Sequence, residues 1–149
     1  MRRAAIAGLV LLATLGATAG PAPAQDRARD AALIGRWRTS AREGVVGIER
    51  CGATLCGRVL DAAPLRADPD QRDIHNKKPA LRTRRVMNLL VLENFTGGPR
   101  SWKGGPLYDP DSGDRASTGT LTLIDDDTLA VKGCIAPLLC RTQTWKRAR

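Results

Sequence analysis

The stretch 45–60, VVGIERCGATLCGRVL, decides the fold of this chain. Apolar residues alternate with polar or small ones on both sides of a central turn, a pattern typical of a β-hairpin. If residues 52–55 form a four-residue loop, three pairs of residues face each other: Cys51 and Cys56, Glu49 and Arg58, and Ile48 and Val59. This one register satisfies hydrophobic sorting, charge pairing and disulfide reach, so it predicts a bond between Cys51 and Cys56.

The segment 121–146 shows a similar pattern near the C-terminus. We expect the acidic triplet 125–127 to form a turn, which pairs Leu123 with Leu129 and Leu121 with Val131. A second turn at residues 136–139 returns the chain, and the cysteines that flank it predict a disulfide between Cys134 and Cys140. The face turned away from these cysteines then carries Leu129, Val131, Gln143 and Trp145.

Short strands separated by turn signals account for most of the remaining chain. We expect them at residues 33–39, 86–95, 102–108, 115–124 and 128–134. Residues 62–80 are rich in Pro, Asp and basic side chains and lack clear periodicity, so they are expected to form one long loop. About eight short strands without a helical period indicate an all-β fold, either a small antiparallel barrel or a sandwich.

The first 24 residues have the organisation of a secretory signal peptide. A basic start precedes an uncharged apolar run over residues 4–19, and the small-x-small pattern at 22–24 predicts cleavage after Ala24, with a second option after 17–19. A transmembrane anchor is the alternative, which the short, alanine-rich run disfavours. The expected organisation is a signal peptide at 1–24, a polar lead-in at 25–32 and a barrel domain at 33–149.

Export would place the mature chain in the periplasm or outside the cell, where paired cysteines become disulfides. The alternative is a four-thiolate zinc site, but C-x4-C with C-x5-C is looser than the usual structural zinc spacing. A redox C-x-x-C motif is absent from the sequence, and a single histidine excludes a His-rich metal centre. We therefore expect no metal and no cofactor.

The charge of the chain favours anionic partners. The sequence has 24 basic and 15 acidic residues, a formal charge of +9, which becomes +7 when Arg2 and Arg3 leave with the signal peptide. Outside the cytosol such partners are cell-envelope polymers, lipid head groups or acidic small molecules rather than nucleic acid, because one Phe and one Tyr provide no stacking platform. The mature sequence contains no second apolar stretch, so we expect no transmembrane segment in it.

A series of short motifs runs along the chain in a fixed order. They are Gly35-x-Trp37, the 45–60 hairpin with Cys56-Gly57, Leu81-Arg82-x-Arg84, Trp102-x-Gly104-Gly105, Tyr108-Asp109-Pro110-x-x-Gly113, Leu129-x-Val131-x-Gly133-Cys134 and Arg141-Thr142-Gln143-Thr144-Trp145-x-Arg147. In this order and spacing they resemble the DUF2147 family of exported bacterial proteins. The resemblance implies the fold and the compartment but assigns no chemistry. Where that family tends to have glycine, this chain has Asn88, the next best residue for a left-handed backbone.

The two ends of the domain also resemble those of lipocalin-like barrels. Such barrels open with Gly-x-Trp on the first strand, and an arginine near the end of the last strand packs over that tryptophan. The resemblance implies that Arg147 stacks on Trp37 and closes the barrel; the alternative is a plain core tryptophan and a solvated arginine. The fold we predict is therefore a small antiparallel β-barrel of about eight strands, lipocalin-like, with one long loop.

Candidate ligand contacts lie in the long loop and at strand ends. Arg82 and Arg84 share one side of an extended chain and would clamp a carboxylate or phosphate, unless they form a solvated basic edge. Arg141 and Gln143 share the predicted inward face, where polar groups need a partner, either a ligand or water and backbone. The complete candidate set is Asn76, Arg82, Arg84, Trp102, Tyr108, Arg141 and Gln143.

The sequence contains no evident catalytic constellation. His75, the single imidazole, lies in the long loop, and no serine stands in a G-x-S-x-G elbow. An enzyme would be indicated by converging carboxylates, such as Asp73 with Asp109, in a cleft. We therefore expect a binding module for a small anionic or amphipathic ligand or, alternatively, a cell-envelope interaction protein with a filled barrel and a basic surface. A cavity of several hundred Å³ favours the binding module.

Overall fold

The computed structural model describes residue 28 and residues 30–149, so the predicted signal peptide and most of the 25–32 lead-in lie outside the described residues. The described elements are β1 (Gly35–Arg38), β2 (Val45–Cys51), β3 (Thr54–Asp61), α2 (Ala63–Ala67), the 3-10 helix η1 (Pro79–Leu81), β4 (Leu90–Gly97), β5 (Ser101–Gly104), β6 (Leu107–Asp109), β7 (Asp114–Ala116), β8 (Thr118–Asp125), β9 (Thr128–Ala136) and β10 (Leu139–Arg147).

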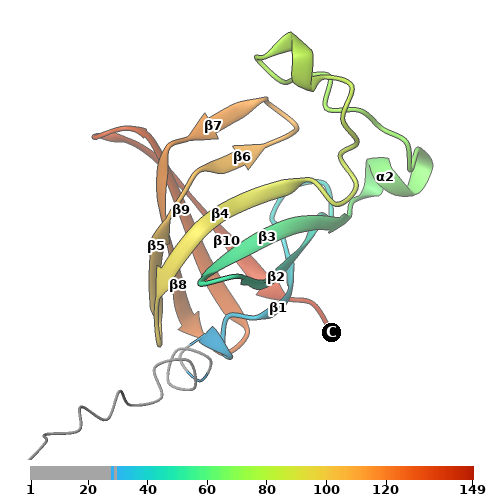
Figure 1. Cartoon of the computed structure of the whole chain (residues 1–149). Helices are drawn as coiled ribbons and strands as arrows, with labels where there is room; N and C mark the ends of the chain where they lie inside the picture. The colour runs from blue at the N-terminus through green and yellow to red at the C-terminus, as the bar shows by residue number, and fades with distance from the viewer. Residues whose placement is uncertain (1–27, 29) are drawn as a thin grey trace, which may run out of the picture.

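Eight strands close into an antiparallel barrel, as predicted (Figure 1). Hydrogen bonding runs through β1, β2, β3, β4, β5, β8, β9 and β10, and β10 pairs back with β1. The β6–β7 hairpin attaches to β4 at one end of the barrel. We call this end, with the β9–β10 turn and the mouth loop (residues 62–89), the mouth; the β2–β3 and β8–β9 turns lie at the opposite, closed end.

The first hairpin has the predicted faces but a different register. Glu49 lies opposite Cys56 and Ile48 opposite Gly57, because a two-residue turn at Gly52 and Ala53 replaces the expected four-residue loop. Gly52 has a φ of +67°, which suits the first central position of a type II′ turn. The register shift is two residues, an even number, so every side chain keeps its predicted face.

The C-terminal strands confirm the predicted register. Leu121 pairs with Val131 and Leu123 with Leu129. On the other side of β9, Gln143 pairs with Val131 and Trp145 with Leu129. The β9–β10 turn is shorter than expected, because β9 continues to Ala136 and β10 starts at Leu139.

Three predictions about the middle of the chain are wrong. The strand expected at 102–108 is two strands, β5 and β6, because the chain turns at Gly105 and Pro106; Gly105 has a φ of +143° and proline donates no ladder hydrogen bond. The strand expected at 115–124 is likewise split, since β7 leaves the barrel to pair with β6. The segment expected to be all loop contains α2, which has a proline in its first turn.

The core runs along the barrel axis and is densest at the closed end. Its side chains with at most 1% exposure include Leu33, Trp37, Leu55, Phe95, Trp102, Leu121 and Leu129. Towards the mouth several inward residues, such as Val46, Val59 and Val131, are smaller than the tryptophans and the phenylalanine of the closed end. The interior is therefore filled at one end and less completely filled at the other.

Candidate ligand-binding cavity

The mouth half of the barrel contains a cavity of about 460 Å³. Apolar side chains from five barrel strands and the β6–β7 hairpin form most of its wall, including Val46, Val59, Val91, Leu92, Leu107, Ala116, Val131 and Trp145, and Ile135 and Leu139 extend this wall at the mouth. Polar and charged side chains line it as well, namely Thr39, Arg42, Asp61, Gln71, Asp109, Asp111, Asp114, Arg141 and Gln143. A cavity of this size and character is typical of a site for a drug-sized ligand.

Strand β10 places three predicted residues on the cavity wall. Arg141, Gln143 and Trp145 occupy every second position of β10, so they share its inward face, and all three line the cavity. The Trp145 indole donates a hydrogen bond to Gln143 Oε1 over 2.9 Å, which fixes the carboxamide and directs its NH₂ group away from the indole. Arg141 lies closest to the mouth and is exposed. The stripe therefore runs from an indole through an amide to a guanidinium, that is, from apolar to cationic.

Charged side chains around the opening are mostly paired with one another. Arg42 and Asp111 form an ion pair of 3.1 Å, and Lys77 Nζ lies 2.5 Å from Asp114 Oδ1. Burial raises the pKa of the Asp111 carboxyl above its ordinary value, although the Arg42 guanidinium acts in the opposite direction. The hydrogen bond from Lys77 lowers the pKa of Asp114. These pairs hold the mouth loop and the β1–β2 turn against the β6–β7 hairpin.

Four of the predicted candidate residues lie around a fully buried carboxylate, Asp73. Asp73 has 0% exposure and accepts hydrogen bonds from Tyr108 Oη (2.5 Å), Asn76 Nδ2 (2.8 Å) and Arg84 Nε (2.8 Å). The Arg84 guanidinium also lies 5.2 Å from the centre of the Tyr108 ring. Arg82 Nε donates to the Asn76 carbonyl over 2.8 Å. Asn76, Arg82, Arg84 and Tyr108, which the sequence predicted as ligand contacts, therefore lie together around Asp73.

Of this group, Tyr108 alone lines the cavity, and its hydroxyl faces Asp73. Arg82 and Arg84 each use Nε on an acceptor within the mouth loop, and neither residue lines the cavity. Burial, together with the hydrogen bond to Asp73, raises the pKa of Tyr108 to about 12. The phenol therefore stays protonated and acts as a hydrogen-bond donor.

Trp102 lies outside the cavity, at the closed end of the barrel. Its side chain has 0% exposure, and its indole NH donates to Asp30 Oδ1 over 2.8 Å. Arg50, which points inward from β2, forms an ion pair with the other oxygen of Asp30. Asp30 is thus a buried anchor in the segment expected to be a polar lead-in, and nothing in the sequence around it indicated this role.

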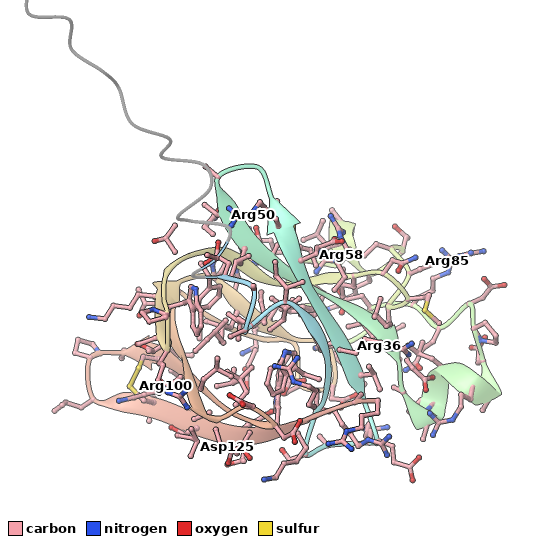
Figure 2. All side chains as sticks on the ribbon, turned by 90° about the horizontal axis from the view of Figure 1, so that it is seen from below. Arg36, Arg50, Arg58, Arg85, Arg100 and Asp125 are labelled. Atoms are coloured by element: carbon pink, nitrogen blue, oxygen red, sulfur yellow. A yellow bond between two sulfur atoms is a disulfide. The ribbon has the colours of Figure 1, made fainter. Side chains whose placement is uncertain are left out.

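The predicted closure of the barrel has the expected geometry. The Arg147 guanidinium lies 4.2 Å from the centre of the Trp37 ring, and Trp37 has 0% exposure. Arg147 also donates to the carbonyls of Asp126 over 2.8 Å and of Ala32 over 2.6 Å. Figure 2 looks along the barrel from this closed end. A single arginine therefore ties together β1, β10, the β8–β9 turn and the segment before β1.

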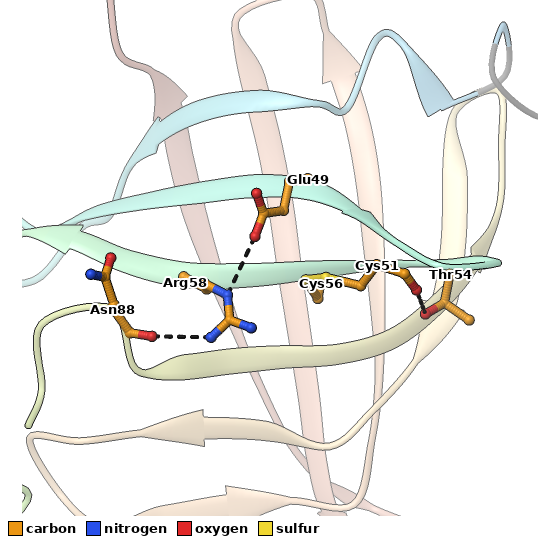
Figure 3. The surroundings of a disulfide bond; sticks show 6 residues. All are labelled: Glu49, Cys51, Thr54, Cys56, Arg58 and Asn88. Atoms are coloured by element: carbon orange, nitrogen blue, oxygen red, sulfur yellow. Dashed lines mark hydrogen bonds and ion pairs between the residues drawn. A yellow bond between two sulfur atoms is a disulfide. The ribbon is translucent and has the colours of Figure 1, made fainter. Parts of the chain in front are cut away.

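The four cysteines form the two predicted disulfides, one between Cys51 and Cys56 and one between Cys134 and Cys140. The first lies beside the closed end, next to the Glu49–Arg58 ion pair of 3.3 Å (Figure 3). The second lies at the mouth. Because the thiols of all four cysteines form disulfides, they are not free to hold a zinc ion as four thiolates. Among the described residues, one cluster combines metal-ligand residue types: Glu49 with Cys51 and Cys56. Its two cysteines form the first disulfide.

Asp73 and Asp109, the two carboxylates whose convergence in a cleft would indicate an enzyme, do not both line the cavity. Asp109 lines the cavity, whereas Asp73 is buried behind Tyr108 and saturated by three donors. His75 lies in the exposed part of the mouth loop and is not among the cavity-lining residues. In the part of the chain that the structure describes, no helix has the length and apolar character needed to cross a bilayer.

Comparison with known proteins agrees with this architecture. A solved structure, described as protein HP1028 from the human pathogen Helicobacter pylori and as belonging to the lipocalin family, superposes with a TM-score of 0.67. The two chains are 20% identical, and the match covers 78% of this chain and 83% of that one, so it shows a shared fold. No curated protein matches the chain. The family model described as "uncharacterized protein conserved in bacteria (DUF2147)" matches residues 35–147, and the chain therefore belongs to the DUF2147 family.

Proposed function

We propose that this chain is an exported, non-enzymatic binding protein whose barrel holds one small amphipathic or anionic molecule. The cavity of about 460 Å³ carries the proposal, since a barrel acting only as a scaffold would be filled by its own side chains. Export is supported by the signal-like sequence of residues 1–24 and by two disulfides, which persist in oxidising compartments.

The lining of the cavity supports an amphipathic ligand held with its polar end towards the mouth. Valines, leucines and the Trp145 indole would receive an apolar body. Gln143 and Arg141 would then offer neutral and cationic donors to an anionic or polar head, and guanidinium hydrogen bonds to anions are stronger than those between neutral groups. The lipocalin-like fold of the comparison structure agrees with a ligand-holding barrel.

Native mass spectrometry of the protein purified from its own periplasm, without denaturation, tests this function directly. A retained non-covalent mass supports the proposal and identifies the ligand. A bare mass at the value for two disulfides, together with no uptake of the anionic amphiphile anilinonaphthalene sulfonate, would contradict it and favour the cell-envelope interaction protein.

A matched pair of variants locates the site. Arg141→Gln removes one cation from the cavity opening and is expected to weaken binding of anilinonaphthalene sulfonate by about tenfold, the effect of losing a charge-assisted hydrogen bond. Arg36→Gln makes the same change on exposed β1 surface beside the inward Trp37, and it should leave the affinity unaltered (Figure 2). Equal effects of the two substitutions would place the bound probe outside the barrel.

A further inference from the structure

Exposed apolar side chains are concentrated at one end of this molecule. In the described part of the chain, the large apolar residues that stand exposed are Ile34, Ile74, Leu81, Ile124, Ile135, Leu138 and Leu139. Five of these seven belong to the mouth loop and the β9–β10 turn, which both project from the mouth end (Figure 1). Clusters of this kind, unlike single scattered residues, mark interaction surfaces.

The β9–β10 turn carries the most exposed of them. We call residues 135–139 the apolar tip; Ile135 is 56% exposed, Leu138 99% and Leu139 60%. The disulfide between Cys134 and Cys140 ties the two strands together at the base of the tip. Leu138 therefore contributes nothing to the core, and its side chain is held out in solvent at the end of a stapled hairpin.

The charge around the mouth complements an anionic surface. Residues 74–85 contain five basic residues and no acidic one. Ion pairs with basic residues of the same chain offset most of the negative charge of the β6–β7 hairpin, because Asp111 pairs with Arg42 and Asp114 with Lys77. Some charged side chains at the mouth end, among the described residues, belong to no ion pair. Four of them are basic, Arg72, Lys78, Arg82 and Arg141, and two are acidic, Asp68 and Asp109.

We propose that the mouth end docks on a bilayer that contains anionic phospholipids. The apolar tip enters the boundary between head groups and acyl chains, and the basic residues of the mouth loop meet the phosphates. One flat partner can contact both projecting segments, because both lie at the mouth end (Figure 1) and both contribute residues to the lining of the cavity. Docking of this kind points the opening at the lipid surface. Ile135 and Leu139 of the tip also line the cavity at its opening, but the inference concerns their exposed sides and does not require the cavity to be occupied.

Co-sedimentation of the mature protein with vesicles of phosphatidylcholine and phosphatidylglycerol tests this docking. We expect binding that falls with added salt and is much weaker on phosphatidylcholine alone. Leu138→Ser should weaken binding by about tenfold, as expected when one leucine is no longer buried. The control is Ile124→Ser, which changes a side chain with 60% exposure next to the β8–β9 turn at the closed end and should have no effect. Both residues are exposed, so both variants keep the fold.

The charge contribution is tested with Lys78→Gln, which should weaken vesicle binding by about fivefold, against Arg36→Gln as control. Insertion is read from Leu138→Trp, whose fluorescence should be quenched by lipids with brominated acyl chains, whereas that of Ile124→Trp should not. The proposal is overturned if the protein stays in the supernatant with anionic vesicles, or if the tip and closed-end variants behave alike. It is also overturned if Leu138→Ser converts a dimer into a monomer, because the tip would then be a contact between copies of this chain.

Discussion

A single carboxylate, Asp73, holds the mouth loop against the β6–β7 hairpin. Its two oxygens accept hydrogen bonds from Asn76, Arg84 and Tyr108, so a buried charge that would otherwise destabilise the fold is balanced by one cation and two neutral donors. The same contacts set the position of Tyr108 on the cavity wall. At the scale of residues, therefore, the polar network behind the wall positions one of the side chains that line the cavity.

Tyr108 is the one tyrosine of the sequence, so its ionisation can be followed directly by ultraviolet absorbance. Its pKa is about 12 in the folded protein, against an ordinary value of 10.0. A pKa raised on folding contributes stability that is fully present below pH 10 and is lost as the pH rises towards 12. We expect the phenolate band to appear near pH 12 in native protein and near pH 10 in guanidinium chloride.

Tyr108→Phe provides the control for this titration. The variant lacks the phenol, so the loss of unfolding free energy between pH 10 and 12 should become smaller than in the wild type. A phenolate band that develops near pH 10 in the folded protein would mean that the hydroxyl is solvated rather than bonded to Asp73.

At the scale of elements, Asn88 ends the mouth loop in a backbone conformation that most residues avoid. Its φ is +62°, and its carbonyl accepts a hydrogen bond from Arg58 over 3.2 Å, which fixes the turn into β4 (Figure 3). Asn88→Val should lower the free energy of unfolding by about 1–2 kcal/mol, because a β-branched side chain is strained there. Asn88→Gly relieves the strain and should stay within about 1 kcal/mol of wild type. Urea unfolding measures both, and a well-tolerated valine would show that the turn adapts.

Local pairing could be predicted from the sequence, whereas pairing between distant segments could not. The alternation of apolar residues fixed which faces of β2, β3, β9 and β10 point inward, and both disulfides followed from it. The turn length at Gly52 escaped prediction, since two- and four-residue loops give the same faces. The division of β5 from β6 and of β7 from β8 arises because β6 pairs with β4 and with β7, whereas β5 pairs with β8 across the inserted β6–β7 hairpin, and none of these partners is set by local alternation.

The candidate site shows the same limit. Arg141, Gln143 and Trp145 were placed on the inward face because regular alternation along one strand is enough to place them. The loop residues Asn76, Arg82 and Arg84 were correctly grouped, but their role depends on Asp73 and on Tyr108, which lies 35 residues away from it. An irregular loop has no period from which the direction of a side chain can be read, so its buried centre went unrecognised.

At the scale of the whole molecule, the barrel is a tube that is sealed at one end and hollow at the other, and Arg147 is central to the seal. Its planar guanidinium stacks on Trp37 at 4.2 Å and donates in several directions to backbone carbonyls. Lysine keeps the charge but can neither stack as a plane nor form this fork of hydrogen bonds. Arg147→Lys is therefore expected to reduce the free energy of unfolding by about 1–3 kcal/mol.

Arg149→Lys, two residues further along, provides the matched control, because Arg149 is 87% exposed and its ion pair with Asp127 should contribute about 0–1 kcal/mol. Urea unfolding measures both variants, and hydrogen exchange of the β1 and β10 amides locates the effect. Strands β1 and β10 share two residue pairs, whereas β10 and β9 share eight. If the barrel opens most easily between β1 and β10, hydrogen exchange in Arg147→Lys should rise first in the amides of these two strands. Uniform loss of protection along all eight strands would instead mean that the ring opens only when the whole barrel unfolds.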